Sequence, residues 1–115
     1  MSKFIKGFGY ALKGLSYAFK TQLNFRFHCA AAVVVILAGW YFKLSGSEWC
    51  WILLAAALVL VAELLNTAIE ALVDLVSPGQ HPKAGAAKDT AAAAVLVAAT
   101  IAAAIGLVIF IPKIF

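Results

Sequence analysis

The chain has 115 residues, a net charge of +4 and a hydrophobic content of 65%. This length suits one domain, and a soluble domain of that size could not bury so much apolar surface. A soluble globular protein is therefore excluded, and lipid is the expected solvent of the fold. Because the basic residues lie beside hydrophobic segments, we expect an anionic membrane surface and an anionic cofactor as their counterparts, and no nucleic acid.

The first segment, residues 3–20, predicts an amphipathic helix. Its apolar residues recur every three or four positions, at Phe4, Phe8, Leu12, Leu15 and Phe19. A separate basic stripe recurs every seven positions, at Lys6, Lys13 and Lys20. This pattern favours a helix that lies in the membrane interface, although an ordinary solvated lysine face would look the same.

Three long apolar segments follow and predict transmembrane helices at 24–42, 49–76 and 90–111. Trp40, Tyr41 and Trp49 mark one membrane interface, as aromatic belts do. The residues between the helices predict a tight turn at 43–48 and a polar loop at 77–89. We therefore expect an all-α integral membrane protein in which residues 1–115 form a single domain.

The distribution of positive charge predicts the orientation in the membrane. Seven of the nine lysine and arginine residues lie on the side of the N-terminal helix and the 77–89 segment, and only Lys43 and Lys113 lie on the other. By the positive-inside rule, the N-terminus and the 77–89 segment face the cytoplasm.

A stripe of polar residues crosses the second apolar segment. Glu63, Asn66, Glu70 and Asp74 are spaced by three, four and four residues, so they share one face of a helix. Counted from Trp49, Glu63 lies roughly 21 Å and Glu70 roughly 31 Å along the helix. Glu63 is thus expected inside the hydrocarbon and Glu70 at the interface. Carboxylates at such depths are costly and indicate a functional site.

These residue types fit phosphoryl transfer. Carboxylates can hold Mg²⁺, lysines can offset phosphate charge, and a desolvated carboxylate can take a proton from an attacking hydroxyl. Glu63 is the candidate base, and the wetter Glu70 suits a metal better. Two alternatives stay open: Glu63 and Asn66 could form hydrogen bonds between membrane helices, and Glu70 with Asp74 could be a solvated helix end.

The other polar residues have plain structural explanations. His28 and His81 are expected to be interfacial or structural, because two isolated histidines make no zinc site. Lys88 and Asp89 could simply begin the third apolar helix, where an aspartate is favourable. The sequence has no standard phosphate-binding glycine loop, so any ATP is bound without one.

Several motifs together carry a family resemblance. The stripe reads Glu-Leu-Leu-Asn-Thr-Ala-Ile-Glu-Ala-Leu-Val-Asp at 63–74, followed by His-Pro at 81–82 and Ala-Lys-Asp-Thr at 87–90. Upstream are Gly-Tyr-Ala-Leu-Lys-Gly-Leu at 9–15 and Asn-Phe-Arg-Phe-His at 24–28. These motifs span nearly the whole chain and resemble the prokaryotic diacylglycerol kinase family, small membrane lipid kinases that include the undecaprenol kinases.

The resemblance implies a surface helix with three transmembrane helices, a homotrimer with active sites shared between subunits, and a location in the bacterial inner membrane. It implies ATP and Mg²⁺ as well. By position, Glu63 would be the base on the lipid hydroxyl, Asn66 would position it, and Glu70 would bind the metal. The nucleotide and its phosphates would lie near Asp74, Lys88 and Asp89, with Lys6 and Tyr10 of the surface helix close to the nucleotide.

One position departs from the family pattern. Where the family usually has a second metal-binding glutamate, this chain has Gln22. An amide oxygen can reach Mg²⁺, but it is neutral and a poorer ligand for a hard cation. Weaker metal binding, replacement by Asp74 or water, and impaired activity all remain open.

The expected function is ATP-dependent phosphorylation of a membrane lipid alcohol, either undecaprenol or diacylglycerol. The motifs at 24–28 and 81–82 favour the undecaprenol kinase branch. Two alternatives are a degenerate relative that only binds nucleotide or lipid, and a non-enzymatic small membrane protein. A conducting path is disfavoured because Thr100 is the one polar residue inside the third apolar segment.

Overall fold

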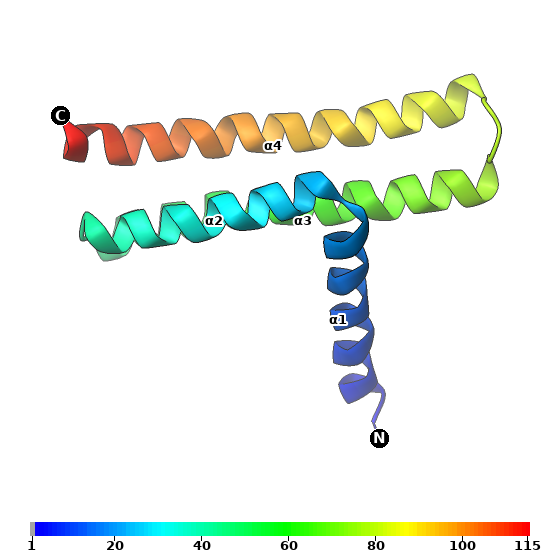
Figure 1. Ribbon diagram of the computed structural model, residues 1–115, viewed down its shortest axis with the longest axis horizontal. Helices are drawn as coiled ribbons and strands as arrows, with labels where there is room; N and C mark the ends of the chain where they lie inside the picture. Colours follow the sequence, from blue (N-terminus) through cyan, green and yellow to red (C-terminus); the bar gives the residue numbers. More distant parts are fainter. Residues whose placement is uncertain (1) are drawn as a thin grey trace.

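Four α-helices follow one another in the computed structural model, which describes residues 2–115: α1 (Lys3–Thr21), α2 (Leu23–Tyr41), α3 (Gly46–Val76) and α4 (Pro82–Ile114). α3 contacts both α2 and α4, and its longest contact is with α4. α1 projects sideways from this bundle (Figure 1). The helices α2, α3 and α4 are each long and apolar enough to cross a membrane. The expected all-α architecture, with one amphipathic helix and three apolar ones, is confirmed.

The lengths of the helices divide the bundle into two zones. α2 has 19 residues and is about 28 Å long, close to the ~30 Å thickness of bilayer hydrocarbon. α3 has 31 residues and α4 has 33, so these helices are about 46 and 50 Å long. Figure 1 shows that both continue past α1 to the loop that joins them. The polar half of α3 therefore extends beyond the level at which α2 begins.

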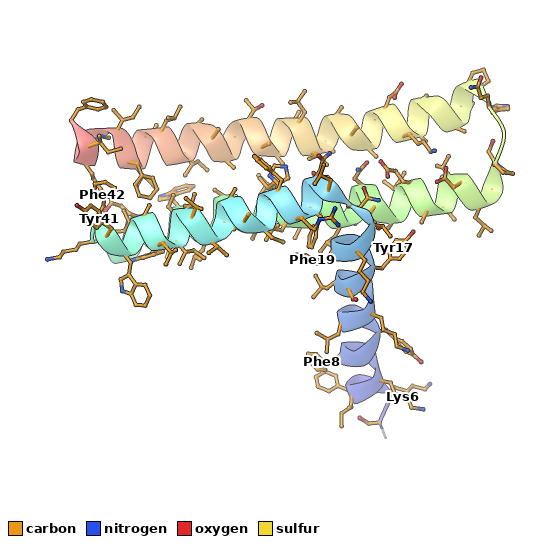
Figure 2. All side chains as sticks on the ribbon, in the orientation of Figure 1. Lys6, Phe8, Tyr17, Phe19, Tyr41 and Phe42 are labelled. Carbon is orange, nitrogen blue, oxygen red and sulfur yellow. The ribbon has the colours of Figure 1, made fainter. Side chains whose placement is uncertain are left out.

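α1 shows two chemically different sides. Phe8 and Phe19 project towards the end of the bundle that carries Tyr41 and Phe42, whereas Lys6 projects the opposite way (Figure 2). The aromatic side chains of this helix are exposed in the single chain. This is the arrangement expected of a helix in a membrane interface, with aromatics towards hydrocarbon and lysine towards water.

The corner between α1 and α2 is held by backbone capping. The Gln22 N–H donates to the Ala18 carbonyl at 2.9 Å and closes the last turn of α1. Arg26 turns back from the first turn of α2, and its Nη1 donates to the carbonyls of Phe19 (2.7 Å) and Lys20 (3.2 Å). Carbonyls at a helix C-terminus lack partners within the helix, so this side chain ties α1 to α2.

A short turn connects α2 to α3. The N–H of Lys43 donates to the Trp40 carbonyl at 3.3 Å, and that of Leu44 donates to the Gly39 carbonyl at 3.1 Å. Lys43 has φ 54°, so it takes the left-handed conformation that this Schellman ending requires. The turn brings Gly39 against the ring of Trp49.

Ion pairs join α3 and α4 at both ends. At one end Lys113 Nζ lies 3.1 Å from Glu48 Oε1, and at the other Lys88 Nζ lies 2.5 Å from Asp74 Oδ1. Glu48 also completes a capping box with Ser45, which starts α3 earlier than the predicted position 49. Both pairs form in the same register of α4 along α3.

α4 begins well before the predicted position 90. Pro82 occupies its first turn, where a missing N–H costs nothing, and the Nδ1 of His81 accepts from the Lys83 N–H at 3.1 Å. Most of the segment expected as a polar loop, 77–89, is therefore helical, because α4 includes residues 82–89. Lys88 and Asp89 lie within the helix and not in a loop.

Replacement of Gly39 by alanine is expected to destabilise the protein. A Cβ there would lie 2.7 Å from Cη2 of Trp49 and 2.9 Å from Cδ1 of Leu44. Overpacking of this kind typically lowers the free energy of unfolding by about 1–3 kcal/mol. Thermal unfolding of Gly39→Ala in detergent micelles measures the loss. Gly106→Ala is the control, because nothing lies within 4 Å of a Cβ there. Equal unfolding temperatures for both variants and the wild type would contradict this packing.

Candidate active site

The polar stripe of α3 passes from a buried to an exposed environment along one face. Glu63 and Asn66 are buried, Glu70 is half-buried and Asp74 is exposed. α1 crosses α3 near Thr67, where Leu64, Thr67 and residues of α1 line a common cleft. The side chains of the stripe therefore become more exposed along α3 from Glu63, near the crossing with α1, to Asp74 beyond it.

Glu63 has an unusual environment for a carboxylate. Its side chain is 1% exposed, and neither carboxylate oxygen has a hydrogen-bond partner within residues 2–115. Its closest polar neighbour is His28 of α2, whose Nε2 lies 3.5 Å from Glu63 Oε1. An oxygen acceptor that is buried without a donor is costly, so the site is prepared for a donor from outside the chain.

The proximity of His28 to Glu63 was missed by the sequence reasoning, which treated the histidine as interfacial or structural. His28 belongs to a different helix, so no local spacing relates it to the stripe. A usable signal exists, because α2 and α3 are antiparallel around the turn at 42–45. Counted outwards from that turn, His28 lies 13 residues from the end of α2 and Glu63 lies 17 residues from the start of α3, a difference of about one helical turn.

Asn66 links the buried and half-buried parts of the stripe. Its Nδ2 donates to Glu70 Oε1 at 3.3 Å, whereas its Oδ1 is buried and has no partner in the described chain. Thr67 Oγ1 donates to the Glu63 carbonyl at 2.8 Å, which satisfies the hydroxyl within the helix. Asn66 thus orients Glu70 and leaves one acceptor available.

At the exposed end of the stripe, Lys88 of α4 lies beside Asp74 and at the edge of a cavity. Lys88 pairs with Asp74, and both side chains are largely accessible to solvent, so the pair contributes little stability. Lys88 also lines a cavity of about 620 Å³ with Ser77, His81 and the residues between them. A cation at the edge of such a hollow suits a phosphate group. Asp89 is exposed one residue further on.

Other predicted site residues lie apart from this cluster. Tyr10 is 66% exposed on α1, with Lys13 Nζ at 5.8 Å from its ring centre, and Lys6 is exposed as well. Neither Lys6 nor Tyr10 makes a hydrogen bond or ion pair with the Asp74–Lys88 end within the part of the chain described. Gln22 is half-buried at the α1–α2 corner and its side chain makes no capping hydrogen bond there.

The donor set fits a magnesium site that is completed by substrate. Within residues 2–115, no three histidine, cysteine, aspartate or glutamate side chains come together as a preformed metal cage. Mg²⁺ usually binds one or two carboxylates and takes its other ligands from water and substrate phosphates. Glu70, half-buried and oriented by Asn66, offers a hard oxygen ligand of that kind.

Comparison with known proteins agrees with this chemistry. The profile of the family described as prokaryotic diacylglycerol kinase matches residues 9–110. The chain is 47% identical over 113 residues to the undecaprenol kinase of Bacillus subtilis (strain 168), which covers 98% of this chain and 92% of that protein. It is 33% identical over 101 residues to the diacylglycerol kinase of Escherichia coli (strain K12), covering 88% and 83% of the two chains.

A third relative is longer than this chain. The diacylglycerol kinase of Synechocystis sp. (strain ATCC 27184 / PCC 6803 / Kazusa) is 45% identical over 106 residues, which cover 91% of this chain and 61% of that protein. Since the family profile also spans most of the sequence, this chain belongs to the prokaryotic diacylglycerol kinase family of membrane lipid kinases.

Proposed function

We propose that this protein transfers the terminal phosphoryl group of ATP to the hydroxyl of a membrane lipid alcohol, at the cytoplasmic face of the bacterial inner membrane. The burial of Glu63 carries the proposal. This carboxylate would lie on the hydrocarbon side of the level where α1 crosses α3, and it has two oxygen acceptors without a donor in the described chain. A lipid hydroxyl at the membrane boundary would supply the missing donor.

Glu63 is the general base in this proposal. Its carboxylate takes the proton as the hydroxyl oxygen bonds to the phosphorus and the bond to the leaving ADP breaks. Asn66 positions the reacting groups through its link to Glu70 and its free Oδ1. Most of the remaining catalysis would come from positioning, since phosphoryl transfer needs little covalent chemistry from the protein.

Mg²⁺ would be held by Glu70 and Gln22, and when bound it would neutralise charge on the phosphate oxygens. Gln22 lies at the α1–α2 corner, which Arg26 holds against the bundle. The fixed corner limits how far the amide can move. With one carboxylate and one neutral amide, we expect a weaker site than a pair of carboxylates would form.

The nucleotide would lie at the solvent end of α3 and α4. Lys88 can exchange its exposed pair with Asp74 for a phosphate group, and Asp89 lies beside it. Lys6 and Tyr10 lie on α1 without contact to this end in one chain, so a second copy could bring the surface helix to the nucleotide. A homotrimer with shared sites, as in the family resemblance, would supply that copy.

Undecaprenol is the proposed lipid alcohol. The relative named undecaprenol kinase matches this chain almost end to end at 47% identity, whereas two relatives named diacylglycerol kinase are 45% and 33% identical. Identity alone therefore separates the two alcohols only weakly. The motifs at 24–28 and 81–82 support the same choice. Wild-type protein in lipid vesicles, given labelled ATP and Mg²⁺, tests both the reaction and the substrate.

Glu63→Gln is expected to lower the turnover number by about 10²–10⁴-fold, because the amide cannot accept the hydroxyl proton. Transfer of labelled phosphate to undecaprenol measures the loss. Glu48→Gln is the control, since it makes the same chemical change at the opposite end of α3, in the pair with Lys113. Turnover near the wild-type level in Glu63→Gln would rule out Glu63 as the base.

The wild-type protein is expected to favour undecaprenol over diacylglycerol by roughly tenfold or more in kcat/KM, a ratio within the range that apolar sites achieve. The two alcohols are offered separately at matched mole fractions in the same vesicles. An equal or reversed ratio would refute undecaprenol as the preferred substrate and leave the reaction class standing.

Gln22→Glu is expected to lower the Mg²⁺ concentration that gives half-maximal activity, because a second carboxylate is a stronger ligand for a hard cation. A magnesium titration of the initial rate measures the shift. Thr21→Glu adds the same charge at the neighbouring exposed position and controls for a general electrostatic effect. An unchanged magnesium requirement in Gln22→Glu would show that residue 22 does not reach the metal.

A further inference from the structure

A buried base must lose its proton before it can act again. If Glu63 takes the hydroxyl proton, as in the function proposed above on which this inference rests, each turnover leaves a neutral carboxylic acid in the site. The Glu63 side chain is 1% exposed, so water has almost no direct access to it. A second group must therefore carry the proton out.

His28 is placed for that task. Its Nε2 lies 3.5 Å from Glu63 Oε1, and its side chain is 20% exposed against 1% for Glu63, so the ring reaches from the buried carboxyl towards the outside of the chain. The contact joins two helices that are packed together, α2 and α3. The distance is slightly long for a hydrogen bond, and a rotation of either side chain would shorten it.

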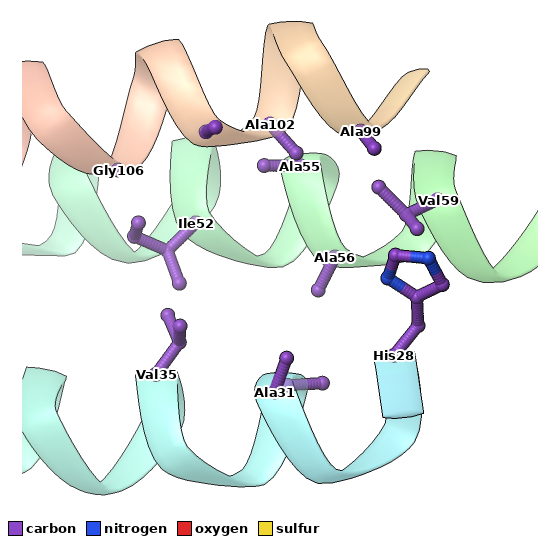
Figure 3. Close-up of a pocket in the computed structure, with 12 residues that line it drawn as sticks. His28, Ala31, Val35, Ile52, Ala55, Ala56, Val59, Ala99, Ala102 and Gly106 are labelled. Atoms are coloured by element: carbon purple, nitrogen blue, oxygen red, sulfur yellow. The ribbon is translucent and has the colours of Figure 1, made fainter. Parts of the chain in front are cut away.

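The cleft beside the ring contains no other titratable group among the described residues. His28 lies at one end of a cleft of about 240 Å³ between α2, α3 and α4, and Figure 3 shows its ring directed towards Val59 of α3. The other described residues that line the cleft are alanine, valine, isoleucine and glycine, so none of them titrates. Glu70, the next carboxylate along the stripe, already accepts a hydrogen bond from Asn66.

We propose that His28 is the proton-exit residue of this site. After phosphoryl transfer, the O–H bond of the Glu63 carboxylic acid breaks and the proton passes to the unprotonated Nε2 of His28. This leaves an imidazolium beside a carboxylate. The imidazolium then releases its Nδ1 proton to water through its exposed edge, so one proton reaches solvent for each phosphoryl group transferred. His28 acts through Glu63 and positions it; it does not contact the reacting atoms.

The proposal predicts that loss of His28 affects the rate of the first turnover much less than the rate of the later ones. In His28→Gln, the first phosphoryl transfer does not depend on regeneration of the base, so it should run within about twofold of the wild-type rate. Regeneration of the base becomes slow, and the steady-state rate should fall by roughly tenfold or more. Free imidazole in the buffer, which can enter the space that the ring leaves, should restore part of the steady-state rate without changing the first turnover.

The experiment compares two regimes in undecaprenol-containing vesicles. The first turnover is followed with protein in excess over labelled ATP, and the steady state with ATP in excess, each with and without imidazole. Glu48→Gln is the control. Glu48 lies at the opposite end of α3, in the pair with Lys113, and takes no part in the proposed site. This control should have the wild-type rate in both regimes, and imidazole should not change either rate.

Each outcome decides the question. A steady-state rate of His28→Gln equal to that of the wild type, or a proportional loss in both regimes that imidazole does not restore, would overturn the proton-exit role. If His28→Gln does not elute as the wild type in gel filtration, His28→Asn is tested by the same criteria. Failure of the wild type to phosphorylate any lipid alcohol would instead overturn the proposed function, which keeps the two failures distinct.

Discussion

The burial of one carboxylate, Glu63, is the constraint on which the rest of the structure depends. A charged group inside bilayer hydrocarbon costs about 2.5–3.5 kcal/mol or more, and a buried acceptor without a donor adds to that cost. The chain reduces the cost in two ways. Glu63 lies near the level of α1 and not at the centre of the bundle, and His28 of α2 lies beside it.

The helices around Glu63 hold its side chain in place, but no group in the described chain donates a hydrogen bond to its carboxylate oxygens. α3 runs unbroken for 31 residues, so the depth of each polar group is fixed by the helical rise. Ion pairs join α4 to α3 at both ends, and the alanine-rich surface between them allows close approach. Arg26 holds α1 at the corner. A rigid scaffold of this kind keeps a polar site ready for its substrate.

In the proposed function, the change in burial along the stripe would separate the two substrates. Glu63 is buried, where a lipid alcohol would meet it, whereas Asp74 is exposed and Lys88 partly exposed, where a water-soluble nucleotide would arrive. Glu70 lies between them, half-buried and tied to Asn66. One helix can thus bring together groups from two phases, because its axis crosses the boundary between them.

The sequence by itself determined the helical class, the membrane environment and the shared face of Glu63, Asn66 and Glu70, because hydropathy and helical periodicity are local properties of one segment. It did not give the early start of α4, which depends on His81 and Pro82 capping a polar stretch. It also missed the contact of His28 with Glu63. That contact joins residues of two helices, so only the antiparallel packing of α2 on α3 could decide it.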